Sequence, residues 1–218
     1  MKKITLKTSL NILNILEKDV LLRLQPFFKE KGLLSGGTAL MLQIPVRKSY
    51  DFDLFFPNEI PQNFLRKASK IFESKIEVLV NNIDELTFIT YDQLKISMIY
   101  FPFLRKYKPV KLDNSVTLSS FKDIASDKAY AIGRRPEFRD YVDLFIILKN
   151  GFNLEQVILD AKDKFKGEFS EKLFLSQLNY FEDMKDFTVE FINEKYDIDE
   201  IKKFLQQKTK NLIHHAAY

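Results

Sequence analysis

Two aspartates, Asp51 and Asp53, are separated by a single residue in the segment SYDFDLFF. Side chains alternate across a β-strand, so a strand over residues 50–56 places both carboxylates on one face, about 7 Å apart. The repulsion between two partly buried carboxylates is relieved most simply by a cation. Carboxylate oxygens suit Mg²⁺ or Mn²⁺, with nucleotide phosphates and waters completing an octahedron. An edge strand with two solvated aspartates is the alternative.

A pair of glycines precedes these aspartates. Gly36 and Gly37 end the apolar segment LLSGG, which we expect to be a short buried strand, and a helix is expected to begin at Thr38. Such a turn exposes backbone N–H groups and a helix N-terminus to an anion, and glycine lets a phosphate approach the chain closely. A phosphate-binding turn followed by a carboxylate pair indicates a site for a nucleoside triphosphate and its metal.

One expected helix, over residues 121–134, carries a lysine on its apolar face. Lys128 lies seven residues after Phe121, on the stripe that also holds Ile124. A lysine at such a position either extends to solvent along its aliphatic stem or meets an anion.

The next expected helix, over residues 137–149, is apolar nearly all round, which predicts burial on most of its surface. Asp140 and Asp143 share one stripe of this helix. Arg139 is placed to pair with Asp143 at the i+4 spacing. An internal salt bridge from Lys128 or Arg139 to these aspartates and a catalytic cleft account equally well for the pattern.

The elements that position these residues predict an α+β protein. The first half mixes helices and strands, and from about Ser119 onward the periodicity is helical alone. The boundary falls within residues 105–118, and we divide the chain between 112 and 113. The expected helices before 113 cover residues 19–31, 38–43 and 63–72, and the expected strands cover 33–37 (ending in the glycine turn), 50–56, 76–80, 85–91 and 94–101. The expected helices after 113 cover residues 121–134, 137–149, 154–165, 171–184 and 199–207.

Composition excludes several classes of protein. The 218 residues contain no cysteine, which excludes disulfides and thiolate metal sites, fits a reducing interior, and leads us to expect a cytoplasmic protein. No apolar run approaches the ~20 residues needed to cross a bilayer, so no membrane partner is expected. A net charge of +4 permits phosphate or nucleic-acid binding without requiring it. Three lysines, Lys162, Lys164 and Lys166, are expected to form a solvated helix end.

Three ordered segments resemble the AbiEii-type nucleotidyltransferase family, the toxin half of a class of bacterial toxin–antitoxin and abortive-infection systems. The first is GGTALMLQIPVRKSYDFDLFF, where thirteen residues separate Gly-Gly from Asp-x-Asp and where Arg47 and Ser49 also agree. The second is FKDIASDKAYAIGRR, with Lys128 and Arg134 or Arg135. The third is FRDYVDLFIIL, with Arg139, Asp140 and Asp143.

The resemblance implies a polymerase-β-like nucleotidyltransferase: a mixed sheet with flanking helices in residues 1–112, and a helical lobe in residues 113–218 that contributes Lys128 and Asp143 to the cleft. By analogy, Asp51 and Asp53 bind Mg²⁺, Lys128 contacts the triphosphate, and Asp143 or Asp140 coordinates metal or activates the acceptor. The implied substrate-binding residues are Gly36, Gly37, Thr38, Arg47, Ser49, Arg135, Arg139 and Asp140.

The implied reaction is attack of an acceptor hydroxyl on the α-phosphorus of a nucleoside triphosphate (NTP), with pyrophosphate leaving. The expected acceptor is RNA, the 3′ end of tRNA, and the expected partner is an antitoxin protein. The alternatives are a protein or small-molecule acceptor, and a degenerate module that binds nucleotide or a partner. One departure from the superfamily is Ser97, which stands where many nucleotidyltransferases have a third carboxylate.

Overall fold

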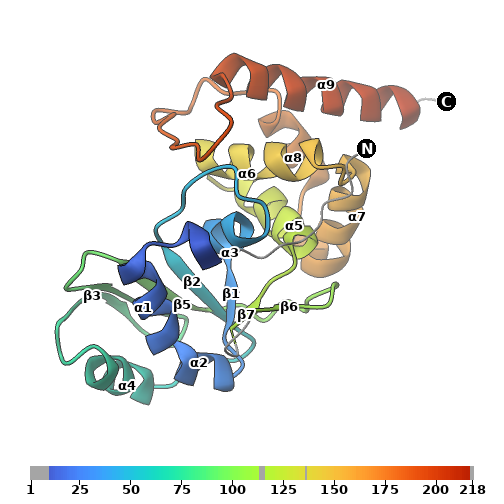
Figure 1. The fold of residues 1–218 in the computed structure, drawn as a ribbon. Helices are drawn as coiled ribbons and strands as arrows, with labels where there is room; N and C mark the ends of the chain where they lie inside the picture. Colours follow the sequence, from blue (N-terminus) through green and yellow to red (C-terminus); the bar gives the residue numbers. More distant parts are fainter. Residues whose placement is uncertain (1–9, 113–115, 136, 217–218) are drawn as a thin grey trace.

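The structure is a computed structural model that describes residues 10–112, 116–135 and 137–216. In these residues seven strands form one mixed sheet with helices on both sides, which confirms the α+β class (Figure 1). Along the sheet the order is β3-β4-β5-β2-β1-β7-β6. The strands are β1 (Leu33–Ser35), β2 (Phe52–Phe56), β3 (Ile76–Asn81), β4 (Glu85–Thr90), β5 (Lys95–Tyr100), β6 (Val110–Lys111) and β7 (Thr117–Leu118).

The helices fall into two groups along the chain. The first comprises η1 (Leu10–Ile12), α1 (Ile15–Arg23), α2 (Gln25–Lys29), α3 (Gly36–Gln43) and α4 (Asn63–Ile71). The second comprises α5 (Phe121–Ile132), α6 (Phe138–Lys149), α7 (Leu154–Phe165), η3 (Lys166–Glu168), α8 (Glu171–Gln177) and α9 (Ile198–Ala216). Within the described residues, no helix is both long enough and apolar enough to cross a bilayer.

Alternation along β2 separates a packed face of the sheet from a polar one. Phe52, Leu54 and Phe56 are buried, whereas Asp53 and Phe55 on the opposite face are half-buried. The packed face is covered by α1, α2 and α4 (Figure 1), and the rings of Phe56 and Phe64 meet edge to face at 5.3 Å. The first group of helices therefore covers the packed face of β2, and the carboxylate face is left to line a site.

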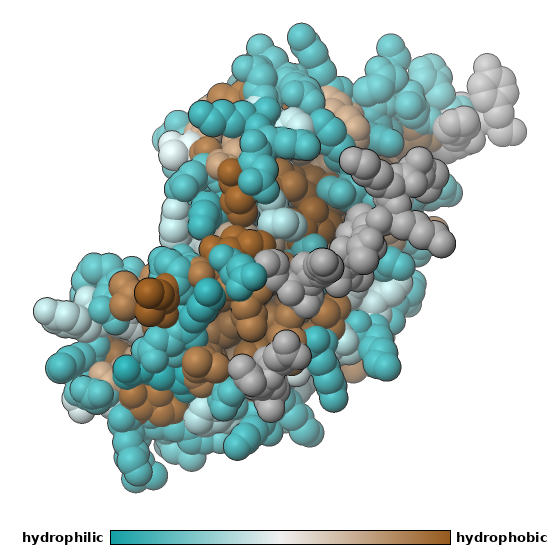
Figure 2. Space-filling view, in the orientation of Figure 1, coloured by the Kyte–Doolittle hydropathy of each residue, from teal (hydrophilic) through white to brown (hydrophobic). Residues whose placement is uncertain are grey.

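The second group of helices packs beside the polar face. Helix α5 contacts α3 and α6 to α8, and α9 closes over α6 and α7. As predicted, α6 is buried on most of its surface, with Arg139 and Lys149 as its exposed residues. Figure 2 shows a mostly hydrophilic surface on the face drawn, with hydrophobic atoms gathered over α1 and in the band between the sheet and the upper helices.

Several expected elements differ in their limits. The expected helix over 19–31 is two helices joined at Leu24, because Pro26 has no N–H for an i→i−4 bond and its ring crowds the preceding turn. The expected helix over 171–184 ends at Gln177, where the side chain of Asn179 donates to the Leu175 carbonyl. Helix α9 runs nine residues past the expected 207.

Two short strands were not predicted. β6 and β7 have two residues each, too few for a periodic pattern. β7 pairs parallel with β1, so the sheet draws on residues on both sides of the expected boundary at 112 and 113. Residues 113–115, next to that boundary, lie outside the described residues.

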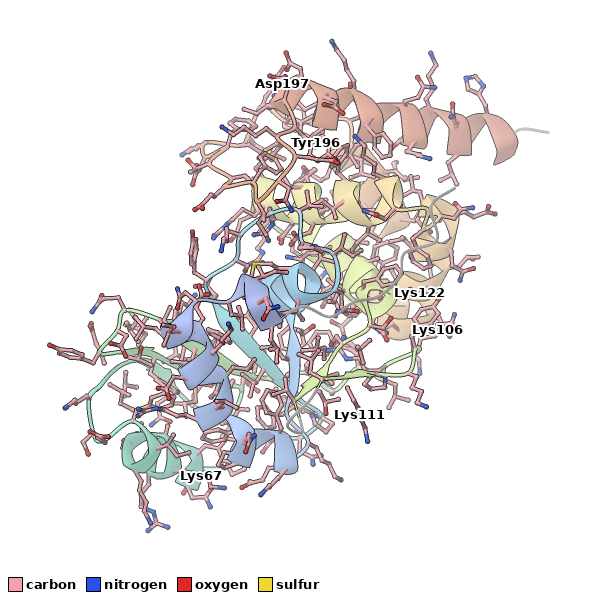
Figure 3. The ribbon with its side chains drawn as sticks, viewed as in Figure 1. Lys67, Lys106, Lys111, Lys122, Tyr196 and Asp197 are labelled. Atoms are coloured by element: carbon pink, nitrogen blue, oxygen red, sulfur yellow. The ribbon has the colours of Figure 1, made fainter. Side chains whose placement is uncertain are left out.

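A buried ion cluster ties the loop after β5 to α5 and α7. The ammonium of Lys164 lies 2.8 Å from Asp123 and 3.0 Å from Asp127, and its side chain is 1% exposed. Asp123 also accepts the backbone N–H groups of Lys106 and Tyr107. Lys106, labelled beside β6 in Figure 3, pairs with Asp160 of α7. Lys164 is therefore not solvated, and that expectation was wrong.

We predict that Lys164→Met lowers the free energy of unfolding by about 3–5 kcal/mol, because it leaves the buried Asp123 without a cation and Asp127 with Arg105 alone. The matched control is Lys162→Met on the same helix, whose side chain is 51% exposed and pairs with Glu171. The control should change stability by less than about 1 kcal/mol. Urea unfolding of the three proteins measures both values, and equal effects would contradict the structural role of Lys164.

Candidate active site

The predicted site residues gather in one cleft of about 380 Å³ between the polar face of the sheet and helices α5 and α6. Larger cavities of about 740 Å³ lie elsewhere, but neither brings the predicted residues together. We therefore select the site by its chemistry rather than by its size. The polar residues of its lining are Ser35, Arg47, Ser49, Asp51, Asp53, Glu85, Lys95, Ser97, Asp127, Lys128, Arg135, Glu137, Arg139 and Asp140.

The carboxylate pair lies on the floor of this cleft. β2 begins at Phe52, so Asp51 precedes the strand instead of belonging to it, yet both aspartates face the cleft as predicted. Asp53 stands opposite Ser35 on β1 and opposite Ser97 on β5. Burial, and then the charge of Asp51, raise the pKa of Asp53 to about 6, although Lys128 and other cations partly offset the rise. Two carboxylates so placed favour a proton or a cation between them.

The glycine turn sits directly against Asp53. Gly36 has a φ of +66°, and a Cβ there would lie 2.5 Å from Asp53 Oδ2. A Cβ on Gly37 would lie 2.6 Å from both Arg47 Nη2 and Ser49 Oγ. A side chain on either residue would therefore have to displace the side chains that surround the turn.

Helix α3 begins at this turn, and the N–H groups of its first turn have no side-chain cap. The N-cap residue, Ser35, makes no side-chain capping bond, and its Oγ is buried without a hydrogen-bond partner. Thr38 Oγ1 donates to the Asp51 carbonyl at 2.5 Å, which holds the segment before β2 against the helix. A buried hydroxyl and uncapped N–H groups beside a carboxylate pair form a suitable cradle for phosphate oxygens.

A buried ion network forms the opposite wall. Arg47 binds Asp143 through two hydrogen bonds, Nε to Oδ1 at 2.6 Å and Nη2 to Oδ2 at 2.8 Å. Lys128 Nζ lies 2.7 Å from Asp143 Oδ2 and 2.6 Å from Asp140 Oδ1. Arg135 Nε adds a contact to Asp140 at 3.2 Å.

The network keeps all its central groups charged. Burial alone would lower the pKa of Arg47 and of Lys128, but the neighbouring aspartates outweigh it and raise both. Burial would raise the pKa of Asp143, but Arg47 and then Lys128 lower it. Removing Asp143 would leave Arg47 without an ion pair in a site with little water.

With this geometry in view, sequence comparison identifies the family. The model described as nucleotidyl transferase AbiEii toxin, Type IV TA system, matches residues 19–212. The chain belongs to this family. It is therefore a nucleotidyltransferase, as the resemblance implied.

Individual relatives agree with this assignment. An uncharacterized protein of Aquifex aeolicus (strain VF5) is 32% identical over 186 residues, which cover 83% of this chain and 87% of the relative. Among solved structures, an H. pylori protein described as a "putative nucleotidyltransferase" has a TM-score of 0.57 at 20% identity and covers 96% of both chains. MenT4, a nucleotidyltransferase toxin of Mycobacterium tuberculosis H37Rv, has a TM-score of 0.58 at 13% identity, covering 91% of this chain and 82% of its own. These two likenesses show a shared fold.

In this AbiEii-family protein, all but two of the predicted site residues line the cleft. Thr38 lies behind Asp51, and Asp143 lies behind Lys128 and Arg47. The predicted pair of Arg139 with Asp143 was wrong: Arg139 is 58% exposed and lies near Glu137. Arg47, distant in sequence, takes Asp143 instead. The pairing of Lys128 with the aspartates was among the expected alternatives.

Residues that the sequence did not single out also line the cleft, notably Ser35, Glu85 and Lys95. Alternation along β4 and β5 places Glu85 and Lys95 on the face of Ser97, but only the strand order brings that face beside Asp53. In the described part of the chain, no group of three or more acidic, histidine or cysteine side chains is placed to hold one metal ion. The carboxylate pair, the buried Ser35 hydroxyl and the glycine cradle nevertheless fit a cation shared with a triphosphate.

The raised pKa of Asp53 predicts a pH-dependent penalty in metal-free protein. A folded-state pKa above the ordinary value gives stability that is present below pH 4 and is lost as the pH rises through about 6. In EDTA at pH 8, the free energy of unfolding of Asp53→Asn should therefore be about 1–3 kcal/mol higher than that of wild type. At pH 4 the two free energies should be equal. The exposed Asp84→Asn is the control. Urea unfolding at both pH values tests this, and a destabilised Asp53→Asn protein at pH 8 would contradict it.

Proposed function

We propose that this protein transfers a nucleoside monophosphate from an NTP to a hydroxyl group of RNA, at the 3′ end of tRNA, as a metal-dependent cytoplasmic toxin restrained by an antitoxin. The observation that carries the proposal is the contact of the glycine turn with the carboxylate pair: the Cβ that Gly36 lacks would lie 2.5 Å from Asp53 Oδ2. A triphosphate held by that turn would place its phosphates against the two aspartates.

Asp51 and Asp53 would hold Mg²⁺ (or Mn²⁺), which when bound neutralises phosphate charge and orients the reacting oxygens. Burial and the charge of Asp51 raise the pKa of Asp53, so its ionised carboxylate is costly by itself and a bound cation would offset that cost. Thr38 fixes the backbone carbonyl of Asp51 and so the approach of that residue to the pair.

The triphosphate would lie between the glycine turn and the ion network. Lys128 has three N–H donors, of which Asp140 and Asp143 take two, so one remains for a phosphate oxygen. Ser35 Oγ and the N–H groups of Gly36 and Gly37 would serve the same ligand from the other side. Arg135 and Arg139, each more than half exposed, would meet phosphates at the cleft mouth.

Asp143 would act through its neighbours. Both its oxygens are bonded to Arg47 and Lys128, and it does not line the cleft. We therefore assign it as a positioning residue that orients Lys128, rather than as the metal ligand or the group that activates the acceptor.

The proposed RNA acceptor and antitoxin are supported by the family description and by the charge of the protein. The family description names a toxin of a type IV toxin–antitoxin system, and such a system pairs a toxin with an antitoxin. The net charge of +4 and the exposed arginines at the cleft mouth suit a polyanionic acceptor. A protein or small-molecule hydroxyl remains the competing acceptor, and the test below separates them.

We predict that purified protein with MgCl₂, an α-labelled NTP and total bacterial RNA places label in a tRNA-sized band. Asp51→Ala with Asp53→Ala should reduce the label at least about 100-fold, because the charge of the phosphates is then uncompensated. EDTA should do the same, and Asp84→Asn should not.

The outcomes distinguish the acceptor classes. Pyrophosphate release without labelled RNA would reassign the acceptor to a protein or a small molecule. Triphosphate binding with no turnover against any acceptor would identify a binding module, and label that survives loss of both aspartates would refute the chemistry.

We also predict that Gly37→Ala weakens NTP binding at least about tenfold. The new methyl group would collide with Arg47, which cannot withdraw because Asp143 holds it by two hydrogen bonds. Gly167→Ala, at a position with open space around it, is the matched control. Isothermal titration with each NTP and MgCl₂ measures the affinity, and equal affinity in both variants would place the triphosphate elsewhere.

A further inference from the structure

Glu85 lies on the polar face of the sheet, within the cleft of the carboxylate pair. The register explains its position. Asp53 on β2 pairs with Ser97 on β5, which pairs with Thr87 on β4. Two residues before Thr87, Glu85 emerges on the same face, opposite Ile99. A carboxylate is therefore present one strand beyond Ser97, the position where a third acidic residue was missing.

Glu85 differs from the other carboxylates that line the cleft. Asp140 is paired with Lys128 and Arg135, Asp127 with Arg105 and Lys164, and Glu137 with Arg135. Apart from Asp51 and Asp53, Glu85 is the one cleft carboxylate in the described residues for which no ion pair is formed. Its Oε1 accepts a hydrogen bond from Thr87 Oγ1 at 2.5 Å, and no described group bonds its Oε2.

Glu85 is not placed as a metal ligand. Among the described residues, no trio of potential ligands converges on one point, so Glu85 cannot join Asp51 and Asp53 around a single ion. Ile99 and Phe55 share the row of Glu85 across the sheet, whereas Asp53 lies in the next row, with Ser97 and Thr87. The carboxylate therefore faces a different part of the bound substrates.

The direction of phosphoryl transfer indicates which part. The attacking and leaving oxygens of such a reaction lie roughly in line through the phosphorus. The glycine turn follows β1, on one side of β2, so a triphosphate held there directs its leaving pyrophosphate to the β1 side. The acceptor must then approach from the opposite side of β2, where β5 and β4 lie. Glu85 faces that approach.

We propose that Glu85 is the catalytic residue that binds the attacking hydroxyl of the acceptor and takes its proton. Glu85 Oε2 accepts the proton as the acceptor oxygen forms its bond to the α-phosphorus. The bond from that phosphorus to the bridging oxygen breaks, and pyrophosphate leaves with the electron pair. The proton then passes to solvent. The hydrogen bond from Thr87 holds Oε1, so the carboxylate presents Oε2 in one orientation. This role rests on the proposed nucleotidyl transfer.

The test compares Glu85→Gln, Glu85→Asp and wild type in the RNA-labelling reaction with MgCl₂. Glutamine has the shape of glutamate, and the backbone bonds of Glu85 to Asn82 in the β3–β4 turn do not involve its side chain. Glu85→Gln should slow transfer about 100-fold at saturating NTP, the usual size of a general-base contribution. Its affinity for a non-reactive α,β-methylene NTP should stay within about twofold of wild type. Glu85→Asp keeps a carboxylate, so its rate of transfer should lie between the rates of Glu85→Gln and wild type.

Glu77→Gln is the matched control, because it removes an exposed carboxylate from the neighbouring strand β3, outside the cleft. It should label RNA at the wild-type rate. If Glu85→Gln also labels RNA within about threefold of the wild-type rate, Glu85 is not the base and the proposed function stands. An equal loss of rate in Glu85→Asp and Glu85→Gln, with weakened nucleotide binding, would show a structural role and overturn the inference. Wild-type protein that labels no RNA would overturn the proposed function instead.

Discussion

The geometry of the site depends on the ion pairs that Asp143 makes with Arg47 and Lys128. The three residues come from the loop before β2, from α5 and from α6, and all are shielded from water. A charge in such a place is stable only while its partners hold it, so the three elements are fixed together. The width of the cleft follows, because Arg47 sits beside the glycine turn and Lys128 faces the carboxylate floor. The buried part of the network is neutral, because Arg47 and Lys128 balance Asp140 and Asp143, and the more exposed Arg135 adds one positive charge beside Asp140.

That balance divides the acidic residues of the cleft into two sets. Those that come from the helices and from the segment before α6 are bonded to cations and shape the wall. Asp51, Asp53 and Glu85 come from the sheet and its approach, and within the described residues they make no ion pair. Burial, and then the neighbouring charge of Asp51, make the ionised carboxylate of Asp53 costly, which its pKa of about 6 reflects. An arriving cation, or a hydroxyl proton, lowers that energy. We take this contrast to separate structural carboxylates from reactive ones.

Local patterns in the sequence were enough to predict the parts of the site whose residues lie close together along the chain. Alternation put Asp51 and Asp53 on one face, and the glycine pair marked the turn into α3. The pairing of Arg139 with Asp143 was wrong because the i+4 rule compares neighbours on one helix, whereas Arg47 reaches Asp143 from 96 residues away. Lys164 was misjudged for the same reason, since its aspartates lie on another helix. Glu85 was missed because its relation to Asp53 exists only once β2 pairs in parallel with β5, a non-consecutive strand.

The two glycines show how closely the wall and the floor constrain each other. Gly36 must be glycine because its φ is +66° and because Asp53 fills the space of a side chain. Gly37 has no such backbone demand, but Arg47 and Ser49 occupy the space around it, and Arg47 is held there by Asp143. The carboxylate floor thus constrains Gly36, and the ion network of the wall constrains Gly37. A change in either the carboxylate pair or the ion network would therefore move the turn, so the phosphate cradle cannot be adjusted without disturbing the groups that would act on the phosphate.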